Sequence, residues 1–196
     1  METTPTVDLE PAARRIVGLL GGVDEPRLDG PTPCPDFTVR DLLAHLTVLS
    51  RGFRDAARKE SGPTTGVAPD DAPPALDDDW RAVLPSLLDE LVAAWRDPAA
   101  RQGTTRVGGV VLPAREAHVV ALEELLVHGW DLARSTGQDY APDEAGLRTA
   151  LNWLTPGDAP RPEHIFARPV PVPDDAPLLD RTVAMSGRRP DWRPER

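Results

Sequence analysis

Apolar residues recur at helical spacing over long, separate stretches of this chain, and this feature most constrains its fold. The clearest stretch runs from Thr38 to about Lys59. Side chains repeating every three or four residues form one stripe along a helix. The stripe consists of Val39, Leu42, Leu43, Leu46, Leu49 and Phe53. Thr38 and Asp41 form a capping-box pattern, with Asp in place of the usual Glu, which predicts where this helix begins.

Three further helices are predicted at about 8–20, 78–95 and 113–137, and a weaker one at 142–153. Pro85 lies within the predicted helix at 78–95 and predicts a kink or a late start there. The stretch TTRVGGVVLPA indicates a short hairpin around Gly108 and Gly109. Four or five helices with a long connection at 61–74 predict an all-α, up-down four-helix bundle.

Length and proline placement indicate the domain organisation. The 196 residues favour a single domain over 1–196. Prolines cluster at 156–177, which indicates a loop. We expect 156–196 to form a proline-rich extension that packs back onto the bundle.

Charge and composition exclude several classes of function. The net charge is −10 and the pI is near 4.8, which argues against binding to nucleic acid or to an anionic membrane. No apolar run approaches the roughly 20 residues of a membrane span. The N-terminus METTPTVDLEPAARR does not resemble a signal peptide, and the single cysteine, Cys34, excludes an intramolecular disulfide. We therefore expect a cytoplasmic protein.

The fourth predicted helix, at 113–137, holds the side chains most informative about function. They lie in the stretch EAHVVALEELLVHGWDLARSTG. At about 100° per residue, Glu124 and His128 lie within roughly 40° of each other, and Asp131 lies on the same face. Glu123 points elsewhere. The shared face is also the apolar stripe, so these groups point toward the interior, where polar groups need partners.

His45, at the edge of the stripe on the second helix, should also face inward. His45, Glu124 and His128 would then form a two-histidine, one-carboxylate set, which zinc enzymes use while leaving a fourth position open. Asp131 could accept a hydrogen bond from a ligand histidine, or it could pair with a backbone group or arginine of a neighbouring helix. The spacing alone is also compatible with core histidines and a surface ion pair, which are the commoner arrangements.

The remaining histidines and the cysteine are interpreted as structural. His118 lies about 120° from Glu124 on the helical wheel and is expected at a flank or on the surface. His164, in the proline-rich segment, is expected to be exposed. Cys34 lies between two prolines, and we interpret it as a small packing residue rather than a nucleophile.

Three stretches together resemble a known family. PTPCPDFTVRDLLAHL at 31–46 is similar to a T-P-C-x-x-W-T-V-x-D-L-x-x-H-L pattern, although Phe37 replaces the tryptophan. EELLVHGWDLARSTG at 123–137 is similar to E-x-x-x-H-x-W-D-x-A-x-A-T-G, and SGRRPDW at 186–192 is similar to a G-R-x-P-x-W ending. The chain thereby resembles the DinB-like, mycothiol-dependent maleylpyruvate isomerase-type metal-binding proteins of actinobacteria, in a short branch that carries the bundle domain only.

The resemblance implies a DinB-like four-helix bundle with a short β-hairpin and a C-terminal extension. It also implies a divalent metal, with zinc the best expectation, held by His45, Glu124 and His128. The implied function is a mycothiol-type transferase or isomerase in which the metal activates a small thiol toward a small electrophile. The alternatives are a non-catalytic metal-binding module, serving as a sensor, scaffold or stress-response protein, and a structural bundle with a vestigial site. A monomer or a homodimer is expected.

Overall fold

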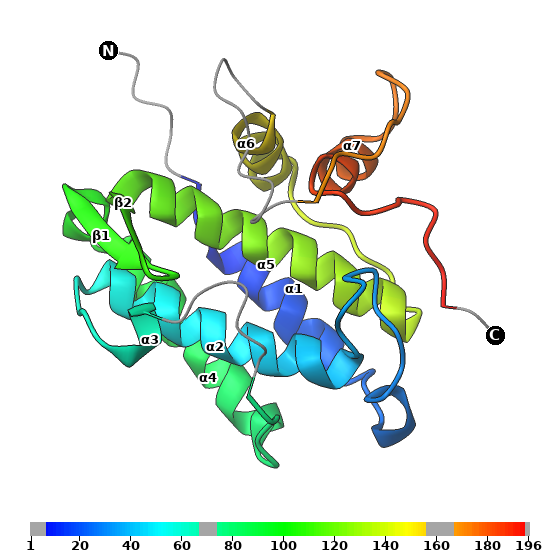
Figure 1. Cartoon of the computed structure of the whole chain (residues 1–196), viewed down its shortest axis with the longest axis horizontal. Helices are drawn as coiled ribbons and strands as arrows, with labels where there is room; N and C mark the ends of the chain where they lie inside the picture. Colours follow the sequence, from blue (N-terminus) through cyan, green and yellow to red (C-terminus); the bar gives the residue numbers. More distant parts are fainter. Residues whose placement is uncertain (1–6, 67–73, 156–166, 195–196) are drawn as a thin grey trace.

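The computed structural model describes residues 7–66, 74–155 and 167–194 (Figure 1). The described part is mostly helical, with one small antiparallel hairpin. In chain order its elements are α1 (Glu10–Leu20), η1 (Glu25–Arg27), α2 (Val39–Ala57), α3 (Pro63–Gly66), α4 (Trp80–Arg96), η2 (Pro98–Arg101), β1 (Thr104–Val107), β2 (Val110–Pro113), α5 (Ala114–Thr136), α6 (Glu144–Leu154) and α7 (Leu178–Met185).

Four helices form the bundle, and α2 and α5 are neighbours within it. Helix α2 packs against α4 and α5, and α1 packs against the same two helices. Leucines dominate the shared core. The predicted all-α bundle with a hairpin is therefore confirmed.

Local signals fix the ends of the two helices that matter most for function. The Thr38 hydroxyl accepts a hydrogen bond from the Asp41 amide at 3.2 Å, and the Asp41 carboxylate accepts one from the Thr38 amide at 2.9 Å. This reciprocal cap starts α2 where the sequence predicts. Helix α5 ends at Gly137, whose φ of 69° is the left-handed conformation typical of a glycine that follows a helix.

The hairpin forms at the predicted glycine pair. Strands β1 and β2 are antiparallel, and Val107 pairs with Val110. Gly108 and Gly109 have φ values of 59° and 75°, the positive values that a tight two-residue turn needs. The hairpin leads directly into α5.

Two elements differ from the sequence expectation in detail. Helix α4 begins at Trp80 and continues through Pro85, so the proline lies inside the helix. The apolar face of α4 is buried on both sides of Pro85, and this burial outweighs the loss of one backbone hydrogen bond. The C-terminal extension contains a helix, α7, that the proline-rich composition did not predict.

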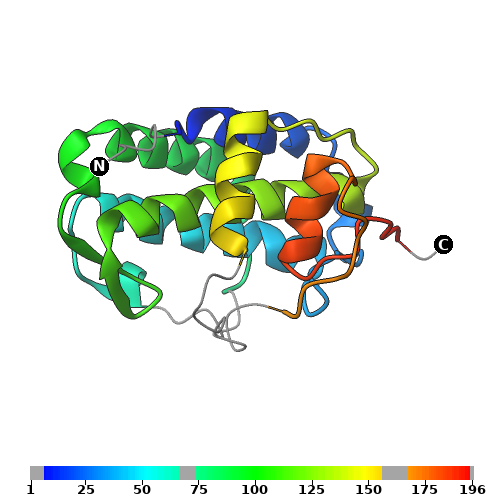
Figure 2. The same ribbon diagram turned by 90° about the horizontal axis from the view of Figure 1, so that it is seen from above.

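Helices α6 and α7 form a second layer on the outside of the bundle. Helix α6 packs on α5, and α7 packs on α6. Seen from above, both lie across the direction of the bundle helices (Figure 2). The chain that follows α7 comes close to α5, where Arg188 contacts Asp131. None of the helices in the described ranges combines the length and apolarity that crossing a bilayer requires.

Candidate metal centre

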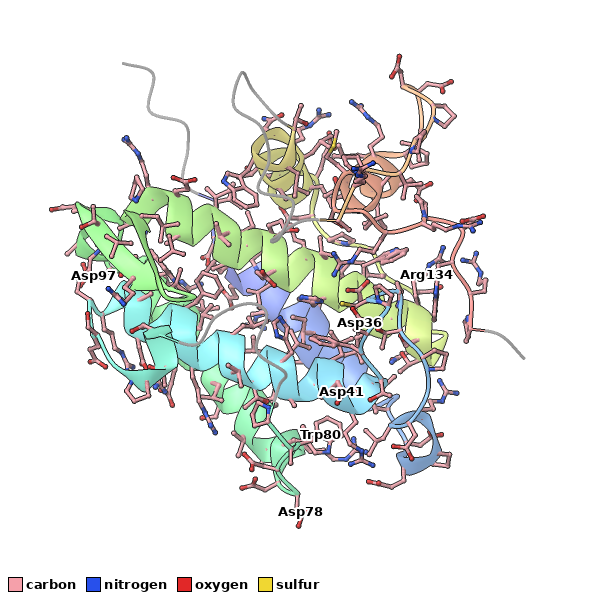
Figure 3. All side chains as sticks on the ribbon, in the orientation of Figure 1. Asp36, Asp41, Asp78, Trp80, Asp97 and Arg134 are labelled. Carbon is pink, nitrogen blue, oxygen red and sulfur yellow. The ribbon has the colours of Figure 1, made fainter. Side chains whose placement is uncertain are left out.

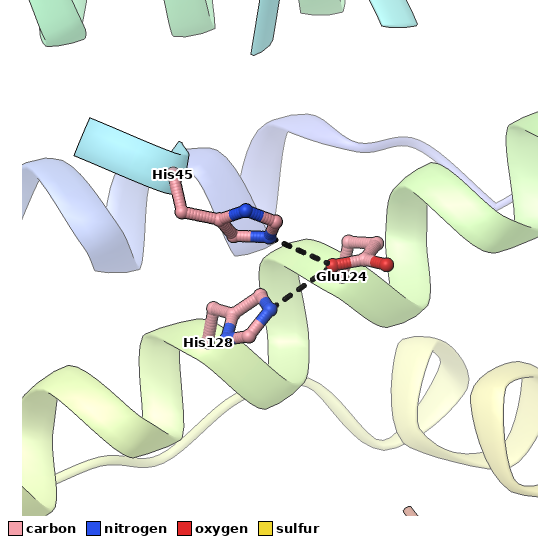
Figure 4. A group of neighbouring side chains, drawn as sticks. All are labelled: His45, Glu124 and His128. Atoms are coloured by element: carbon pink, nitrogen blue, oxygen red, sulfur yellow. Dashed lines mark ion pairs between the residues drawn. The ribbon is translucent and has the colours of Figure 1, made fainter. Parts of the chain in front are cut away.

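Three of the residues selected from the sequence lie together between α2 and α5. His45 projects from α2, and Glu124 and His128 project from α5 toward it (Figure 4). Oε2 of Glu124 lies 3.7 Å from Nε2 of His45 and 3.1 Å from Nε2 of His128. One ligand atom from each residue lies within 4.8 Å of the others.

The donor set fits a small divalent cation. Two imidazole nitrogens and one carboxylate oxygen are ligands that zinc commonly takes. With metal–ligand bonds of about 2.0–2.2 Å in a tetrahedral site, donor atoms lie roughly 3.3 Å apart. The two measured spacings, 3.1 and 3.7 Å, bracket that value.

The cluster is accessible from one side. The side chains of His45 and Glu124 are 24% and 28% exposed, whereas that of His128 is 8% exposed. The rings of His45 and His128 meet edge to face, with centroids 4.8 Å apart. The ring of Phe37, at the aromatic position of the motif, also packs against His45, with centroids 5.3 Å apart. A small molecule could therefore approach His45 and Glu124 while His128 stays shielded.

Behind the cluster, Asp131 binds the far side of His128. Oδ2 of Asp131 lies 3.0 Å from Nδ1 of His128, so Nε2 is left to face Glu124. The same Oδ2 accepts a hydrogen bond from Nη2 of Arg188 at 3.1 Å. The two partners that the sequence offered as alternatives for Asp131, a site histidine and an arginine, are thus both present.

Burial and charge shift the pKa values of the cluster. Burial raises the pKa of the Glu124 carboxyl, but the neighbouring His128 and His45 outweigh it and hold that pKa well below its usual range. Burial lowers the pKa of His128, but Asp131 and Glu124 outweigh it and raise the pKa to about 9. Burial lowers the pKa of His45. Without a metal, His128 is therefore the protonated partner of the two carboxylates.

One interpretation of α5 from the sequence is wrong, and a second residue of this helix is buried outside the predicted face. His118 is buried, with its ring 5.3 Å from that of Trp95, and it lines a separate hollow of about 200 Å³ rather than the surface. Glu123, which the helical wheel turns away from the face shared by Glu124 and His128, is buried as well. It is 4% exposed, and burial together with the charge of Glu124 raises its pKa to about 8. The burial of both residues has one cause, because α5 contacts α1, α2 and α6 and is buried on several sides.

Two further residues interpreted from the sequence are Cys34 and His164. Cys34 is partly buried, and burial raises its pKa to about 11, which agrees with a packing role rather than a nucleophile. His164 lies outside the described residues. Arg188 was not selected from the sequence, because 57 residues separate it from Asp131 and only its SGRRPDW motif drew attention to that region.

Comparison with known proteins identifies relatives of this chain. The model of the family described as "Mycothiol maleylpyruvate isomerase N-terminal domain" matches residues 9–133. Two uncharacterized proteins of Mycobacterium tuberculosis, from strains CDC 1551 and H37Rv, are each 29% identical over 187 residues, covering 94% of this chain and 97% of the relative.

Solved structures show the same fold. The crystal structure of the mycothiol-dependent maleylpyruvate isomerase aligns with a TM-score of 0.55 at 22% identity, and that of a point mutant aligns with 0.57 at 21% identity. Each match covers 76% of this chain and 68% of the isomerase chain.

Proposed function

This chain belongs to the mycothiol maleylpyruvate isomerase N-terminal domain family, and from that membership and its three-donor cluster we propose that it is a metal-dependent enzyme using a low-molecular-weight thiol. The metal is a divalent cation, zinc by preference, held by His45, Glu124 and His128. The thiol is mycothiol or a close analogue, and the second substrate is a small electrophile.

The main support for this proposal is the number of side chains that could donate to a metal. A structural zinc site is closed by four protein ligands, whereas a catalytic site keeps one position for water or substrate. Within the described residues, the cluster has three members. The two candidates for a fourth ligand do not fill that role, because Asp131 binds the opposite nitrogen of His128 and His118 lines another hollow. The arrangement favours an enzyme over a purely structural metal module.

The protein side chains hold and orient the reacting groups. A bound zinc ion would act as a Lewis acid that lowers the pKa of a thiol. His45 and His128 present Nε2 to Glu124 from two helices, and Asp131 fixes the ring of His128 by accepting a hydrogen bond from Nδ1. The ring of Phe37 packs against that of His45 in a tilted arrangement, with centroids 5.3 Å apart.

In the proposed reaction, the thiolate sulfur adds to an electrophilic carbon of the second substrate. A C–S bond forms, and the displaced electron pair moves onto the electron-withdrawing group of the electrophile. In an isomerase the thiolate then leaves after rotation about the carbon–carbon bond. In a transferase the C–S bond persists, and the electron pair either takes up the proton that the thiol released or departs with a leaving group.

A substrate screen tests the proposal. Purified protein is loaded with zinc and given mycothiol with a panel of small electrophiles, including cis-configured unsaturated keto acids. We expect electrophile consumption that requires the thiol, stops with a chelator and is lost in His128→Ala. Metal binding without consumption across the panel would favour the alternative, a non-catalytic metal-binding module.

A further inference from the structure

Arg188 brings a buried positive charge from the C-terminal segment to the back of the candidate metal centre. Its Nη2 lies 3.1 Å from Oδ2 of Asp131, and its Nη1 donates to the carbonyl of Ser186 at 3.1 Å. The Arg188 side chain is 16% exposed and that of Asp131 is fully buried. Loss of either partner of such a buried ion pair is costly, because it leaves the other charge uncompensated.

The backbone conformation around Arg188 directs this residue toward Asp131. Gly187 has a φ of 89°, and a Cβ at that position would lie 2.5 Å from Cβ of Ala167. The Arg188 amide donates to the carbonyl of Val183 at 3.0 Å, which turns the chain back at the end of α7. Further along, Arg134 of α5 donates to the carbonyl of Pro190 and anchors the same segment (Figure 3).

One carboxylate oxygen connects this cation with the cluster. Oδ2 of Asp131 accepts from both Arg188 and Nδ1 of His128, and Nε2 of the same ring faces Glu124. The guanidinium therefore lies one carboxylate and one imidazole away from the place where a metal would bind. At that range, and with little water between, charges interact strongly. A fixed cation there repels a divalent metal ion and attracts an anion bound to it.

We infer that Arg188 sets the charge of this site, lowering its affinity for free divalent metal and raising the affinity of the metal-loaded site for a thiolate. The inference rests on the proposed function, because it deepens the role of the same cluster. Arg188 acts through Asp131 and the local field, so it is a charge-setting residue and not a catalytic one. The C-terminal segment is then part of the site.

The test uses the full chain and compares three variants. Arg188→Gln removes the charge, and Arg188→Lys keeps it. Arg134→Gln weakens the anchoring of the same segment without changing a partner of Asp131. Zinc affinity is measured by competition with a chromophoric chelator. Thiolate affinity is measured on cobalt-loaded protein by titration with β-mercaptoethanol, whose S–H proton passes to the buffer as the sulfur–cobalt bond forms.

We expect Arg188→Gln to bind zinc about tenfold more tightly and β-mercaptoethanol about tenfold more weakly than the wild type. Arg188→Lys and Arg134→Gln should stay within about threefold of the wild type for both ligands. Unchanged or weaker zinc binding by Arg188→Gln would overturn the inference, as would an equal effect of Arg134→Gln. A wild-type protein that binds no zinc would instead overturn the proposed function and the inference together.

A second comparison covers the case in which Arg188→Gln fails to fold. The double variant Asp131→Asn/Arg188→Gln leaves no unpaired charge buried in the bundle. It should bind zinc more tightly than Asp131→Asn alone, because only the repelling cation differs between the two. Equal affinities would show that the charge of Arg188 has no influence on the metal.

Discussion

Oδ2 of Asp131 lies 3.0 Å from Nδ1 of His128, one helical turn earlier on α5. This contact fixes which ring nitrogen of His128 faces Glu124, because the nitrogen that donates to Asp131 cannot also serve as a ligand. A carboxylate that is fully buried behind a histidine in this way orients the ring and raises its basicity. The pair is therefore the first place to perturb the candidate metal centre without touching a ligand.

Asp131→Asn should lower metal affinity by about 10- to 100-fold while helicity is kept. Asparagine keeps the shape and a carbonyl acceptor but removes the negative charge behind His128. Affinity is read by chelator competition and helicity by circular dichroism. If metal affinity is unchanged and only the melting point falls, Asp131 serves the fold through Arg188 and does not act on the metal.

The two histidines of α5 should behave differently on truncation. His128→Ala should abolish stoichiometric metal binding, because it removes one of three donors. His118→Ala should leave metal binding intact and lower the free energy of unfolding by about 1–3 kcal/mol, because it leaves a cavity beside Trp95. Elemental analysis and urea unfolding of both variants provide the measurements. Equal losses of metal would mean that the helix face has been misassigned.

His118 should make the protein less stable in acid. Burial, with the nearby Arg101, lowers its pKa to about 4, although Asp8 acts in the opposite direction, and Arg96 also lines the hollow. The unfolded chain, with a histidine pKa near 6.5, therefore binds more protons than the folded one between the two values. The stability contributed by neutral His118 is complete above about pH 6.5 and is lost as the pH falls toward 4.

The measurement is urea unfolding of wild type and His118→Gln at pH 7 and pH 4.5, with a chelator present throughout. Glutamine does not titrate, so the wild type should lose about 2 kcal/mol more than the variant between these pH values. The metal ligands titrate in both proteins and cancel in the comparison. Parallel pH profiles would show that His118 takes up a proton in the folded state without cost.

Metal removal should destabilise the bundle without unfolding it. The core is formed by leucines of four helices and does not depend on the cluster. Added zinc should therefore raise the melting temperature in proportion to the logarithm of its free concentration, while the circular-dichroism signal of the apo protein stays helical. Loss of the helical signal in the apo protein would contradict this expectation.

The sequence predicted those features that depend on local spacing. The capping box at Thr38 and the glycine that ends α5 are set by residues a few positions apart, and both were placed correctly. The shared face of Glu124 and His128 likewise follows from one helical turn. His45 approaches them from another helix, and this depends on tertiary packing. The family motifs indicated it, whereas residue spacing along one helix could not.

The sequence did not predict the burial of Glu123 and His118, because burial depends on the elements packed around α5 and not on spacing along it. The helical wheel placed Glu123 and His118 away from the main stripe of α5, which is correct geometry. A helix packed on several sides buries more than one stripe, so both residues are inside. The link from Arg188 to Asp131 depends on how the C-terminal extension returns over α6, and no local pattern in the sequence contains that information.

The most direct test of the central claim is the metal content of the protein. Protein purified without an affinity tag, dialysed against zinc and then freed of excess, is analysed for metal per chain. The account predicts one divalent ion per chain in the wild type and near zero in His45→Ala, Glu124→Ala and His128→Ala, with His118→Ala retaining one. A wild-type content near zero after dialysis against zinc would contradict the assignment of His45, Glu124 and His128 as a metal centre.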